Sequence, residues 1–414
     1  MRKHPAALTA AAAALLVFFA VTFAYPLSRM LAQITPEGAA AVFSSTVFRR
    51  AVGSSCLSSG LTMLFALPLA MLMALLTEST RVRCRALWRG IFVLPMLLPS
   101  VSQGTGLVLL LGTNGLLTRG LCLPGSIYGL QGIVLGQVLY TAPRRWVVSA
   151  ARRPAEPPEN PRRDRWALLL CALTALLFVL PVLAFTGTMF MEKYPVQTTL
   201  TLRHLREFWT PQVRAGLRNS VLLGLGTAAV GTALTAAAAL VTARYANRAA
   251  RWVHTLSVLL MAVPGLVLGL SFVLAFKGTA LYGTVWILIL AGVLHFFTTP
   301  YNLLYQSLQK LSSELESVGS TLGIPPLRLI FDVLLPQCAG TLADMAAYFF
   351  VSSTVTISAA AFLSTASTRP LALLVVQYSD QLNLSGAAYL SFLILAVNLL
   401  ARAAAALVRR LVRR

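Results

Sequence analysis

The sequence is poor in charged residues, and poorest in acids and histidines. Asp and Glu together number 12 in 414 residues, and there are four His. Charged residues make up 11% of the chain, against about 25% in a typical soluble domain. Because Lys, Arg, Asp and Glu normally cover the surface, this composition excludes a soluble domain of this size. No acid–base pair, Ser-His-Asp set or metal-ligand cluster is visible, so we predict that the chain is not an enzyme and binds no metal.

Cysteine is also scarce, and its spacing excludes the usual cysteine motifs. The five cysteines are Cys56, Cys84, Cys122, Cys171 and Cys338, and no two stand at CxxC distance. Most lie in or beside apolar runs, where Cys behaves as a small hydrophobic residue. A phosphate-binding GxxxxGK[ST] loop is missing as well, so we expect no ATP or other cofactor on this chain.

What the sequence does contain is apolar residues and positive charge. Hydrophobic residues make up 57% of the chain, and 34 Lys and Arg give a net charge of +22. The high hydrophobicity excludes a disordered chain, and it is foreign to a nucleic-acid-binding domain. The remaining class is a polytopic membrane protein whose positive charges lie in its loops.

Ten apolar segments are close to the roughly 20 residues that a helix needs to cross a bilayer. We therefore predict an all-α membrane protein, with kinks at the interior prolines 68, 95, 99, 181 and 264. The predicted spans are 6–25, 51–77, 88–112, 126–143, 166–187, 219–242, 252–276, 281–300, 339–364 and 386–408.

Arginines gather after the second, fourth and sixth spans and at the C-terminal end. The loops that alternate with these are poorer, since 113–125 holds one Arg and 365–385 holds only Arg369. Positive residues favour the cytoplasmic side. We predict a multi-pass protein of the cell inner membrane with both termini in the cytoplasm. The loop 188–218 departs from the pattern, with five basic residues and two acids.

Two stretches of the sequence are alike. Ser54 and Ser220 each precede an apolar run, a basic loop and a proline, at Pro99 and Pro264, 45 and 44 positions further on. Four spans separate the copies, which predicts parallel repeats rather than inverted ones. After Pro300 the second copy continues into a polar loop and two more spans. The first copy continues instead into an Arg- and Pro-rich segment, so it lacks a long cytoplasmic loop and two helices.

The polar loop 301–336 has a helical pattern. Gly323 stands where a C-terminal cap would end a first helix, and Pro325 and Pro326 open a second. Both helices are too polar to cross the membrane, so we expect them on the cytoplasmic side. Apolar residues recur every three or four positions in the first helix, at Leu304, Leu308, Leu311, Leu315, Val318 and Leu322, and we expect Leu327, Ile330, Phe331 and Leu334 to share one face of the second.

This loop resembles the EAA coupling loop of ABC importer permeases: Glu-Ala-Ala, three residues, Gly, nine residues, Ile, one residue, Leu-Pro. Glu316 stands one place early, and Ser317 replaces the motif glutamate. We call residues 301–336 the coupling loop. Aligned on the second glycine, Ser317, Val318 and Gly319 take the Glu-Ala-Ala place, Gly323 matches the glycine, Val333 the isoleucine, and Leu335 and Pro336 the final pair.

Residues 45–143 and 166–408 resemble the fused two-copy permeases of ferric iron, thiamine and 2-aminoethylphosphonate importers. The resemblance implies two parallel MetI-like bundles of type I importers, the first incomplete. Its domains would be an N-terminal helix (1–30), a truncated first repeat (45–143), a basic linker (144–165), a leading helix with a periplasmic loop (166–218), a second repeat (219–408) and a basic tail (409–414).

The resemblance also implies a function and partners. The chain would be the permease subunit of an ATP-driven importer that moves a small solute across the inner membrane. Two ATPase subunits would hold ATP-Mg and dock on coupling loops, and a periplasmic or lipoprotein binding protein would deliver the solute. The bilayer is the other partner, and nucleic acid is not expected.

Polar residues inside the span 339–364 are candidates for the solute pathway. Asp344 lies in its first turns, where an acid is either functional or paired near the membrane boundary. His295, near the end of another span, fits a packed neutral histidine better than a ligand. Ser352, Ser353, Thr354, Thr356 and Ser358 either line a pathway or bond to neighbouring helices and their own backbone.

Several alternatives stay open. An ion-coupled secondary transporter would need acids at the bilayer centre, and beyond Asp344 the spans offer almost none. A membrane-embedded enzyme would need clustered acids or histidines. The missing loop adds two hypotheses: an internally deleted, non-functional permease, or a homodimer that pairs through the complete second copies.

Overall fold

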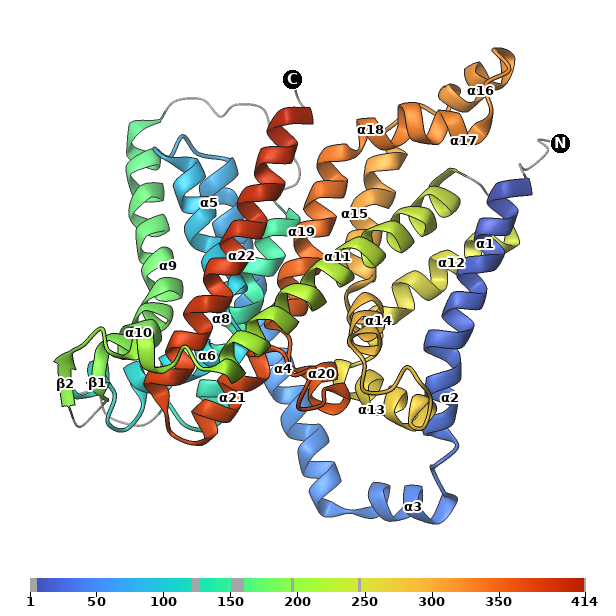
Figure 1. Ribbon diagram of the computed structural model, residues 1–414. Coiled ribbons are helices and arrows are strands. Elements are labelled where there is room, and N and C mark those ends of the chain that lie inside the picture. Colours follow the sequence, from blue (N-terminus) through green and yellow to red (C-terminus); the bar gives the residue numbers. More distant parts are fainter. Residues whose placement is uncertain (1–5, 121–126, 150–159, 195–196, 245–246, 413–414) are drawn as a thin grey trace. The chain divides into compact units, whose positions relative to one another are not determined.

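The computed structural model describes residues 6–120, 127–149, 160–194, 197–244 and 247–412. Its regular structure is almost entirely helical (Figure 1), apart from one short antiparallel pair of strands, β1 (Met191–Lys193) and β2 (Gln197–Leu200). The prediction of an all-α polytopic protein is confirmed. Residues 150–159 of the predicted linker lie outside the described residues, as does Cys122.

The described residues hold up to nine candidate membrane spans. Five are single long helices, and four are pairs of helices bent at a short break. These nine correspond to nine of the ten predicted segments. The tenth, 126–143, lies in α8 (Leu130–Ser149), which is not among the nine candidates. Two glutamines and two arginines lower the hydropathy of that helix.

The chain divides into two compact units. Unit 1 comprises residues 1–34, 211–373 and 396–414, and unit 2 comprises 35–210 and 374–395. The last helix, α22 (Leu384–Val412), belongs to unit 2 up to Leu395 and to unit 1 beyond it. The N-terminal helix therefore clusters with the second copy of the repeat.

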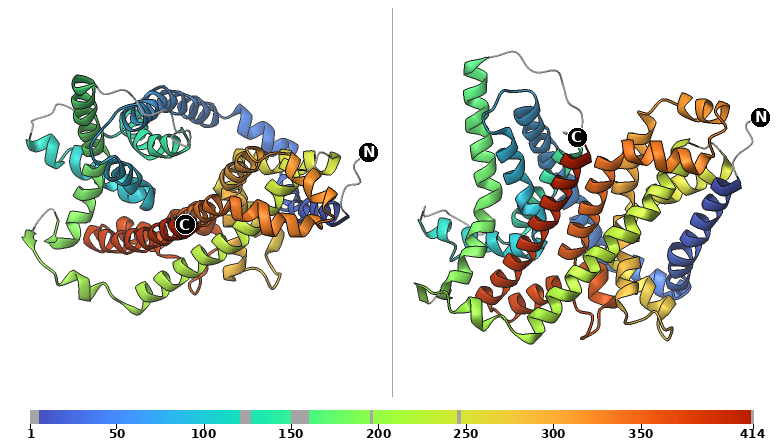
Figure 2. Two further views of the ribbon diagram at one scale, coloured as in Figure 1. Left: turned by 90° about the horizontal axis from the view of Figure 1, so that it is seen from above. Right: turned by 45° about the horizontal axis from the view of Figure 1, so that its top comes forward.

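Unit 1 is built around α11. Its helices are α1 (Ala6–Phe19), η1 (Ala20–Ala24), α2 (Tyr25–Leu31), α11 (Pro211–Arg244), α12 (Arg248–Leu259), η4 (Leu260–Ala262), α13 (Gly265–Phe276), α14 (Val285–Phe296), α15 (Thr298–Gln309), α16 (Glu314–Thr321), α17 (Pro326–Leu329), η5 (Ile330–Leu334), α18 (Leu335–Gln337), α19 (Ala339–Val355) and α20 (Ser358–Leu363). Helix α11 packs against α19, α15 and α14. Helix α1 lies along α12 and α2 along α13 (Figure 2), and Phe19 at the end of α1 meets Phe297, between α14 and α15, edge to face.

Glycines allow α11 and α19 to approach closely. A Cβ atom at Gly231 would lie 2.7 Å from Cζ of Phe349, and one at Gly224 would lie 2.7 Å from the ring of Phe350. Both phenylalanines are buried. The two rings occupy the space that these glycines leave on α11. Close packing of this kind through small residues is a main source of association between membrane helices.

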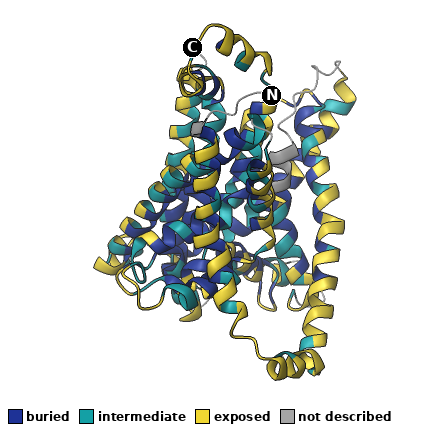
Figure 3. Cartoon of the chain, turned by 90° about the vertical axis from the view of Figure 1, so that its right-hand side faces the viewer, coloured by how far each residue is buried: buried dark blue, intermediate teal, exposed yellow. Residues whose placement is uncertain are grey.

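Unit 2 is built around α4 and α9. Its elements are α3 (Pro36–Ser44), α4 (Thr46–Glu78), α5 (Arg85–Val93), η2 (Leu94–Leu97), α6 (Ser100–Leu111), α7 (Leu116–Gly120), α8, α9 (Pro161–Gly187), η3 (Thr188–Phe190), the two strands, α10 (His204–Glu207), most of α21 (Leu371–Asp380) and the start of α22. Helix α4 packs on α8, and α9 packs on α6. Helix α3 buries no residue, as its yellow colour in Figure 3 indicates.

The same bend occurs once in each unit. In unit 2 the chain turns by 101° between η2 and α6, and in unit 1 it turns by 109° between η4 and α13. Pro99 and Pro264 stand at these breaks with nearly equal dihedral angles, φ −56°, ψ 143° and φ −61°, ψ 142°. Proline removes a backbone donor and prevents the helix from continuing. Pro68 and Pro181, which we also expected at kinks, lie inside the continuous helices α4 and α9.

Candidate functional site

The coupling loop begins inside a helix. We predicted one amphipathic helix from Leu304 to Leu322, and this is wrong, because α15 ends at Gln309 and α16 starts at Glu314. The Oγ atom of Ser312 accepts a hydrogen bond from the backbone N–H of Glu314 at 3.1 Å. Serine side chains that bond to nearby backbone in this way compete with a continuous helix. The stretch that packs against unit 1 therefore ends before the projecting stretch begins (Figure 1).

Gly323 ends α16 as predicted. Its φ is +67°, in the left-handed region that favours glycine. The N–H of Ile324 donates to the carbonyl of Gly319 at 2.9 Å, and the N–H of Gly323 donates to that of Ser320 at 3.2 Å. The long bond across the turn is that of a Schellman cap, which reverses the chain direction after a helix.

The second arm of the loop starts at Pro326, with Pro325 as its N-cap, as the two prolines predicted. The shared face that we expected is wrong, because η5 is a π-helical turn that shifts the side-chain phase. Ile330 and Leu334 are buried, as is Leu329, which we had not assigned to this face. Leu327 and Phe331 are exposed instead.

Exposed apolar residues of both arms surround the Gly323 turn. Val318 and Leu322 come from α16, and Leu327 and Phe331 come from the second arm, each more than half exposed. The second arm has one ion pair between described residues, in which Arg328 Nε lies 3.1 Å from Asp332 Oδ2, so the two opposite charges cancel. The tip is therefore an apolar surface with little net charge, of a kind that commonly marks a contact with another protein.

Of the other motif positions, only Gly319 is fully buried inside the loop. Gly319 is buried, and a Cβ there would lie 3.4 Å from Leu329 of the second arm. Ser317 is exposed, Val333 and Leu335 are half-buried, and Pro336 is exposed. Gly319 is the motif residue at which the two arms lie closest.

Glu316, next to the motif position, faces inward. Its Oε1 lies 3.1 Å from Nε of Arg244, the last residue of α11. The Arg244 side chain is 6% exposed and that of Glu316 21%. Arg244 also donates from Nη1 to the carbonyl of Leu311 at 3.2 Å and from Nη2 to that of Ser312 at 3.5 Å. One buried guanidinium therefore holds both the break before α16 and α16 itself.

A second contact lies two residues earlier on α11. Thr242 Oγ1 lies 2.9 Å from Oη of Tyr301, and His254 Nδ1 of α12 lies 2.5 Å from the same oxygen. Tyr305 stacks on Tyr301 one turn further along α15. These bonds join the end of α11 and the middle of α12 to α15, the helix that leads into the coupling loop.

Sequence reasoning missed Arg244, Tyr301 and His254 as parts of this site. Arg244 was counted only as one of several basic residues that indicate the cytoplasmic side. A signal was present, since it is the first arginine after the apolar run of α11. Which acid it would meet depends on how the chain folds back 72 residues later, at Glu316.

The polar candidates of α19 bond mainly within unit 1. Ser353 Oγ donates to the carbonyl of Phe350, and Thr354 Oγ1 donates to that of Val351 and lies 2.8 Å from Oδ1 of Asn398 on α22. Ser352, Ser353 and Thr354 are buried. Ser353 and Thr354 thus make bonds of the second kind that the sequence left open, and a place in the solute pathway stays a prediction.

Near the end of α19 the chain unwinds, and the remaining candidates lie there. Thr356 and Ser358 are half-buried, with hydroxyl oxygens 3.3 Å apart. A Cβ at Gly265, the first residue of α13, would meet Ser358 Oγ and His295 Cε1. His295 contacts the ring of Phe296 edge to face, which fits a packed histidine.

Asp344 forms an ion pair rather than standing alone. Its Oδ1 lies 2.8 Å from Nη1 of Arg409 in the last turns of α22, and both side chains are more than a third exposed. The pair joins the beginning of α19 to the end of α22. Among the described residues, no group of three His, Cys, Asp or Glu could hold a metal ion.

Residues 230–414 match the family described as the inner membrane component of binding-protein-dependent transport systems. The match covers somewhat less than half of the chain, so it shows what residues 230–414 are similar to. The matched residues contain the coupling loop, the last 15 of the 34 residues of α11 and the helices α12 to α22.

The chain also has named relatives. The Fe(3+)-transport system permease protein FbpB 2 of Haemophilus influenzae is 29% identical over 139 residues, 33% of this chain and 28% of that protein. A ferric transport system permease of Actinobacillus pleuropneumoniae is 28% identical over 186 residues, 44% of this chain and 27% of its own length. A 2-aminoethylphosphonate transport permease of Salmonella paratyphi A is 24% identical over 165 residues, 39% and 62% of the two chains. The chain thus spans little more than a quarter of the length of the ferric relatives.

Proposed function

We propose that this chain is the membrane-spanning permease subunit of an ATP-driven importer. It moves a small solute across the inner membrane, and a separate ATPase subunit hydrolyses ATP. The observation that carries the proposal is the coupling loop of the permease domain. Its two short arms, capped turn and apolar tip project from unit 1 on the ends of α15 and α19.

The chemistry of the tip favours a protein partner with an apolar groove. Val318, Leu322 and Phe331 are exposed, while the carboxylate of Glu316 is already paired with Arg244. Ser317, in the place of the motif glutamate, offers only a hydroxyl. The ATPase subunit therefore meets this loop mainly through apolar contact, and the ATP-Mg stays on that subunit.

Arg244 makes the loop a lever rather than a loose segment. Because its guanidinium contacts Leu311, Ser312 and Glu316, a displacement of α16 pulls on the end of α11. Helix α11 packs along α14, α15 and α19, so its movement changes the packing of the whole unit. Nucleotide binding on the partner then selects between two packings of the permease.

The solute belongs to the class carried by the named relatives, iron(III) or a phosphonate, with thiamine as the third candidate from the resemblance of the whole chain. A binding protein on the outer side delivers it. Both termini lie in the cytoplasm, as the distribution of arginine indicates.

Transport by the reconstituted complex tests the proposal. The chain is purified with its ATPase and binding protein and placed in vesicles, and uptake of labelled ferric iron, thiamine and 2-aminoethylphosphonate is measured. We expect uptake of one solute that requires ATP and the ATPase and is unaffected by ionophores. Uptake that persists without the ATPase and collapses with ionophores would identify an ion-coupled transporter instead.

Gly323→Asp provides a variant of the loop itself. Transport should fall while the protein still inserts, because the turn at φ +67° positions the tip. Normal uptake by this variant would refute the role of the loop.

Stoichiometry separates the remaining hypotheses. A complex with one ATPase per chain and two chains indicates a homodimer paired through the permease domains. A chain that inserts but binds no ATPase is an internally deleted, non-functional permease.

The orientation has its own test. Cys84 is exposed in the loop between α4 and α5, which we place in the cytoplasm. In a variant that keeps Cys84 as its single cysteine, a membrane-impermeant maleimide should label the protein only after the cells are permeabilised, and labelling of intact cells would reverse the topology.

A further inference from the structure

A group of arginines lies on unit 2 where α4 ends and α9 begins. Residues 78–89 and 160–165 contain seven arginines and two acids, a net charge of +5. The first set follows the apolar part of α4, and the second forms the first turn of α9. The sequence interpretation explained them only as markers of membrane topology.

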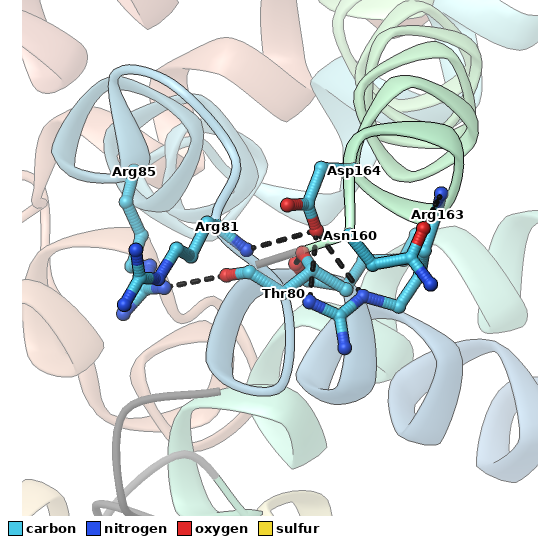
Figure 4. Close-up of polar contacts among 7 residues, drawn as sticks. Thr80, Arg81, Arg85, Asn160, Arg163 and Asp164 are labelled. Atoms are coloured by element: carbon cyan, nitrogen blue, oxygen red, sulfur yellow. Dashed lines mark hydrogen bonds and ion pairs between the residues drawn. The ribbon is translucent and has the colours of Figure 1, made fainter. Parts of the chain in front are cut away.

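Hydrogen bonds bring the two segments together (Figure 4). Asp164 Oδ1 accepts from the backbone N–H of Arg81 at 3.2 Å and from Nη2 of Arg163 at 3.1 Å. Asn160 caps α9 by accepting from the N–H of Arg163 at 3.2 Å. Arg85 donates to the carbonyl of Thr80 within the loop. The loop after α4 is therefore fastened to the start of α9, which brings the two arginine-rich segments next to each other.

Both acids of this region are already engaged. Asp164 is paired with Arg163, and Oε1 of Glu78 lies 2.6 Å from Nη2 of Arg89. Arg83, Arg162 and Arg165 are exposed. They form no ion pair with any acid of the described ranges, which leaves their charge unbalanced within that part of the chain.

The exposed apolar residues of α9 indicate at which level of the bilayer this arginine surface lies. Trp166 is 66% exposed directly after Arg165, and an exposed face of leucines follows, with Leu169 and Leu173 at its start. Leu173 stands eight residues after Arg165, about 12 Å along the helix at 1.5 Å per residue. Arginine and tryptophan next to a hydrocarbon-facing surface lie at the level of lipid headgroups.

We propose that Arg83, Arg162 and Arg165 form a binding site for the phosphodiester of an acidic phospholipid such as phosphatidylglycerol. The guanidinium groups meet the phosphate, and the leucines below them meet the acyl chains. The described part of unit 2 has no coupling loop at this end, so lipid occupies the surface that the missing loop leaves open. The inference goes beyond the proposed function and holds even for a chain that does not transport.

Lipid titration of the full purified chain tests the site. Native mass spectrometry measures the binding of phosphatidylglycerol, with phosphatidylcholine as the neutral reference. We expect the wild-type chain to prefer phosphatidylglycerol clearly. Each of Arg83→Gln, Arg162→Gln and Arg165→Gln should lower the affinity about fivefold, and the triple variant that combines them should lose the preference. The matching lysine substitutions should keep most of the preference, because the attraction is electrostatic.

A matched control removes the same charge elsewhere in the chain. Arg206→Gln, Arg214→Gln and Arg218→Gln change three exposed arginines outside the site. This triple variant should retain the wild-type preference. Equal losses in both triple variants would mean a general charge effect and would overturn the site, as would undiminished binding by the first triple variant.

Competition with inorganic phosphate distinguishes a lipid from a soluble anion. Millimolar phosphate should leave most phosphatidylglycerol bound, because the leucine face contributes to the lipid only. Complete displacement would assign the arginines to a soluble phosphate and would refute the lipid.

Discussion

The helices α11 and α4 start from similar sequence and end in opposite charges. Counted from Ser220 and Ser54, the last residues Arg244 and Glu78 stand at the same position, 24 residues on. Arg244 meets Glu316 of the coupling loop, whereas Glu78 meets Arg89 of the next helix, α5. The end of α11 is therefore fixed to the coupling loop, whereas the end of α4 is paired locally, and the described part of unit 2 holds no such loop.

The middles of α11 and α4 also differ according to the helices that pack against them. Gly231 of α11 leaves room for Phe349 of α19, and the residue at the corresponding position of α4 is Phe65, which is exposed. Among the described residues α4 packs mainly on α8, and Phe65 stays exposed beside that contact. A small residue is needed only where a second helix approaches, so the sequence of each copy fits the helices that surround it.

The largest effect on stability is expected when the residues at these two corresponding positions, Gly231 and Phe65, are exchanged. Gly231→Phe places a ring where a Cβ alone would approach Phe349 to 2.7 Å, and we expect a loss of about 3 kcal/mol or more. Phe65→Gly should cost only about 1 kcal/mol of helix propensity. Apparent melting temperatures in detergent measure both, and equal effects would mean that the two helices have equivalent surroundings.

Removing the buried arginine should have the next largest effect. Arg244→Ala leaves the half-buried Glu316 without its partner and frees Leu311 and Ser312, at a cost of about 3 kcal/mol. The control is Arg328→Ala on the same loop, whose pair with Asp332 is 73% and 60% exposed and contributes under about 1 kcal/mol.

The arginine variant should also uncouple transport from ATP hydrolysis in the reconstituted complex. Solute moved per ATP should fall in Arg244→Ala and stay normal in Arg328→Ala. A charge exchange, Arg244→Glu with Glu316→Arg, should restore part of the coupling, and normal coupling in Arg244→Ala would refute the lever.

A smaller effect is expected at the bond between α19 and α22. Thr354→Val removes the hydroxyl that lies 2.8 Å from Asn398, and we expect a loss of about 1 kcal/mol with solute uptake largely retained. Uptake that is abolished without a change in melting temperature would instead assign Thr354 to the solute pathway.

The smallest effect is expected at the local pair of unit 2. Arg89 is 45% exposed, so Arg89→Ala should cost under about 1 kcal/mol, and less at high salt. Melting temperatures at low and high salt check this. A loss as large as that of Arg244→Ala would remove the distinction between the two helix ends.

Local features of the coupling loop were predictable from sequence. Gly323 and Pro325 act through their own backbone limits, which are the same in any protein, so the cap and the second start were predicted correctly. The break at Ser312 and the π turn at Ile330 were not, because each replaces a regular helical pattern that the apolar spacing fully satisfied. Periodicity describes the average helix and misses one displaced turn.

The sequence by itself determined the membrane class, nearly all of the spans and the place of the loop, because hydrophobicity and backbone restrictions act locally. Tertiary structure alone decided which charged residues are paired and with which partners. Glu316 turns inward because Arg244, far away in the chain, ends beside it, and Asp164 fastens the loop after α4 to the start of α9. A charge takes its role from the partner that folding brings near, and no local rule names that partner.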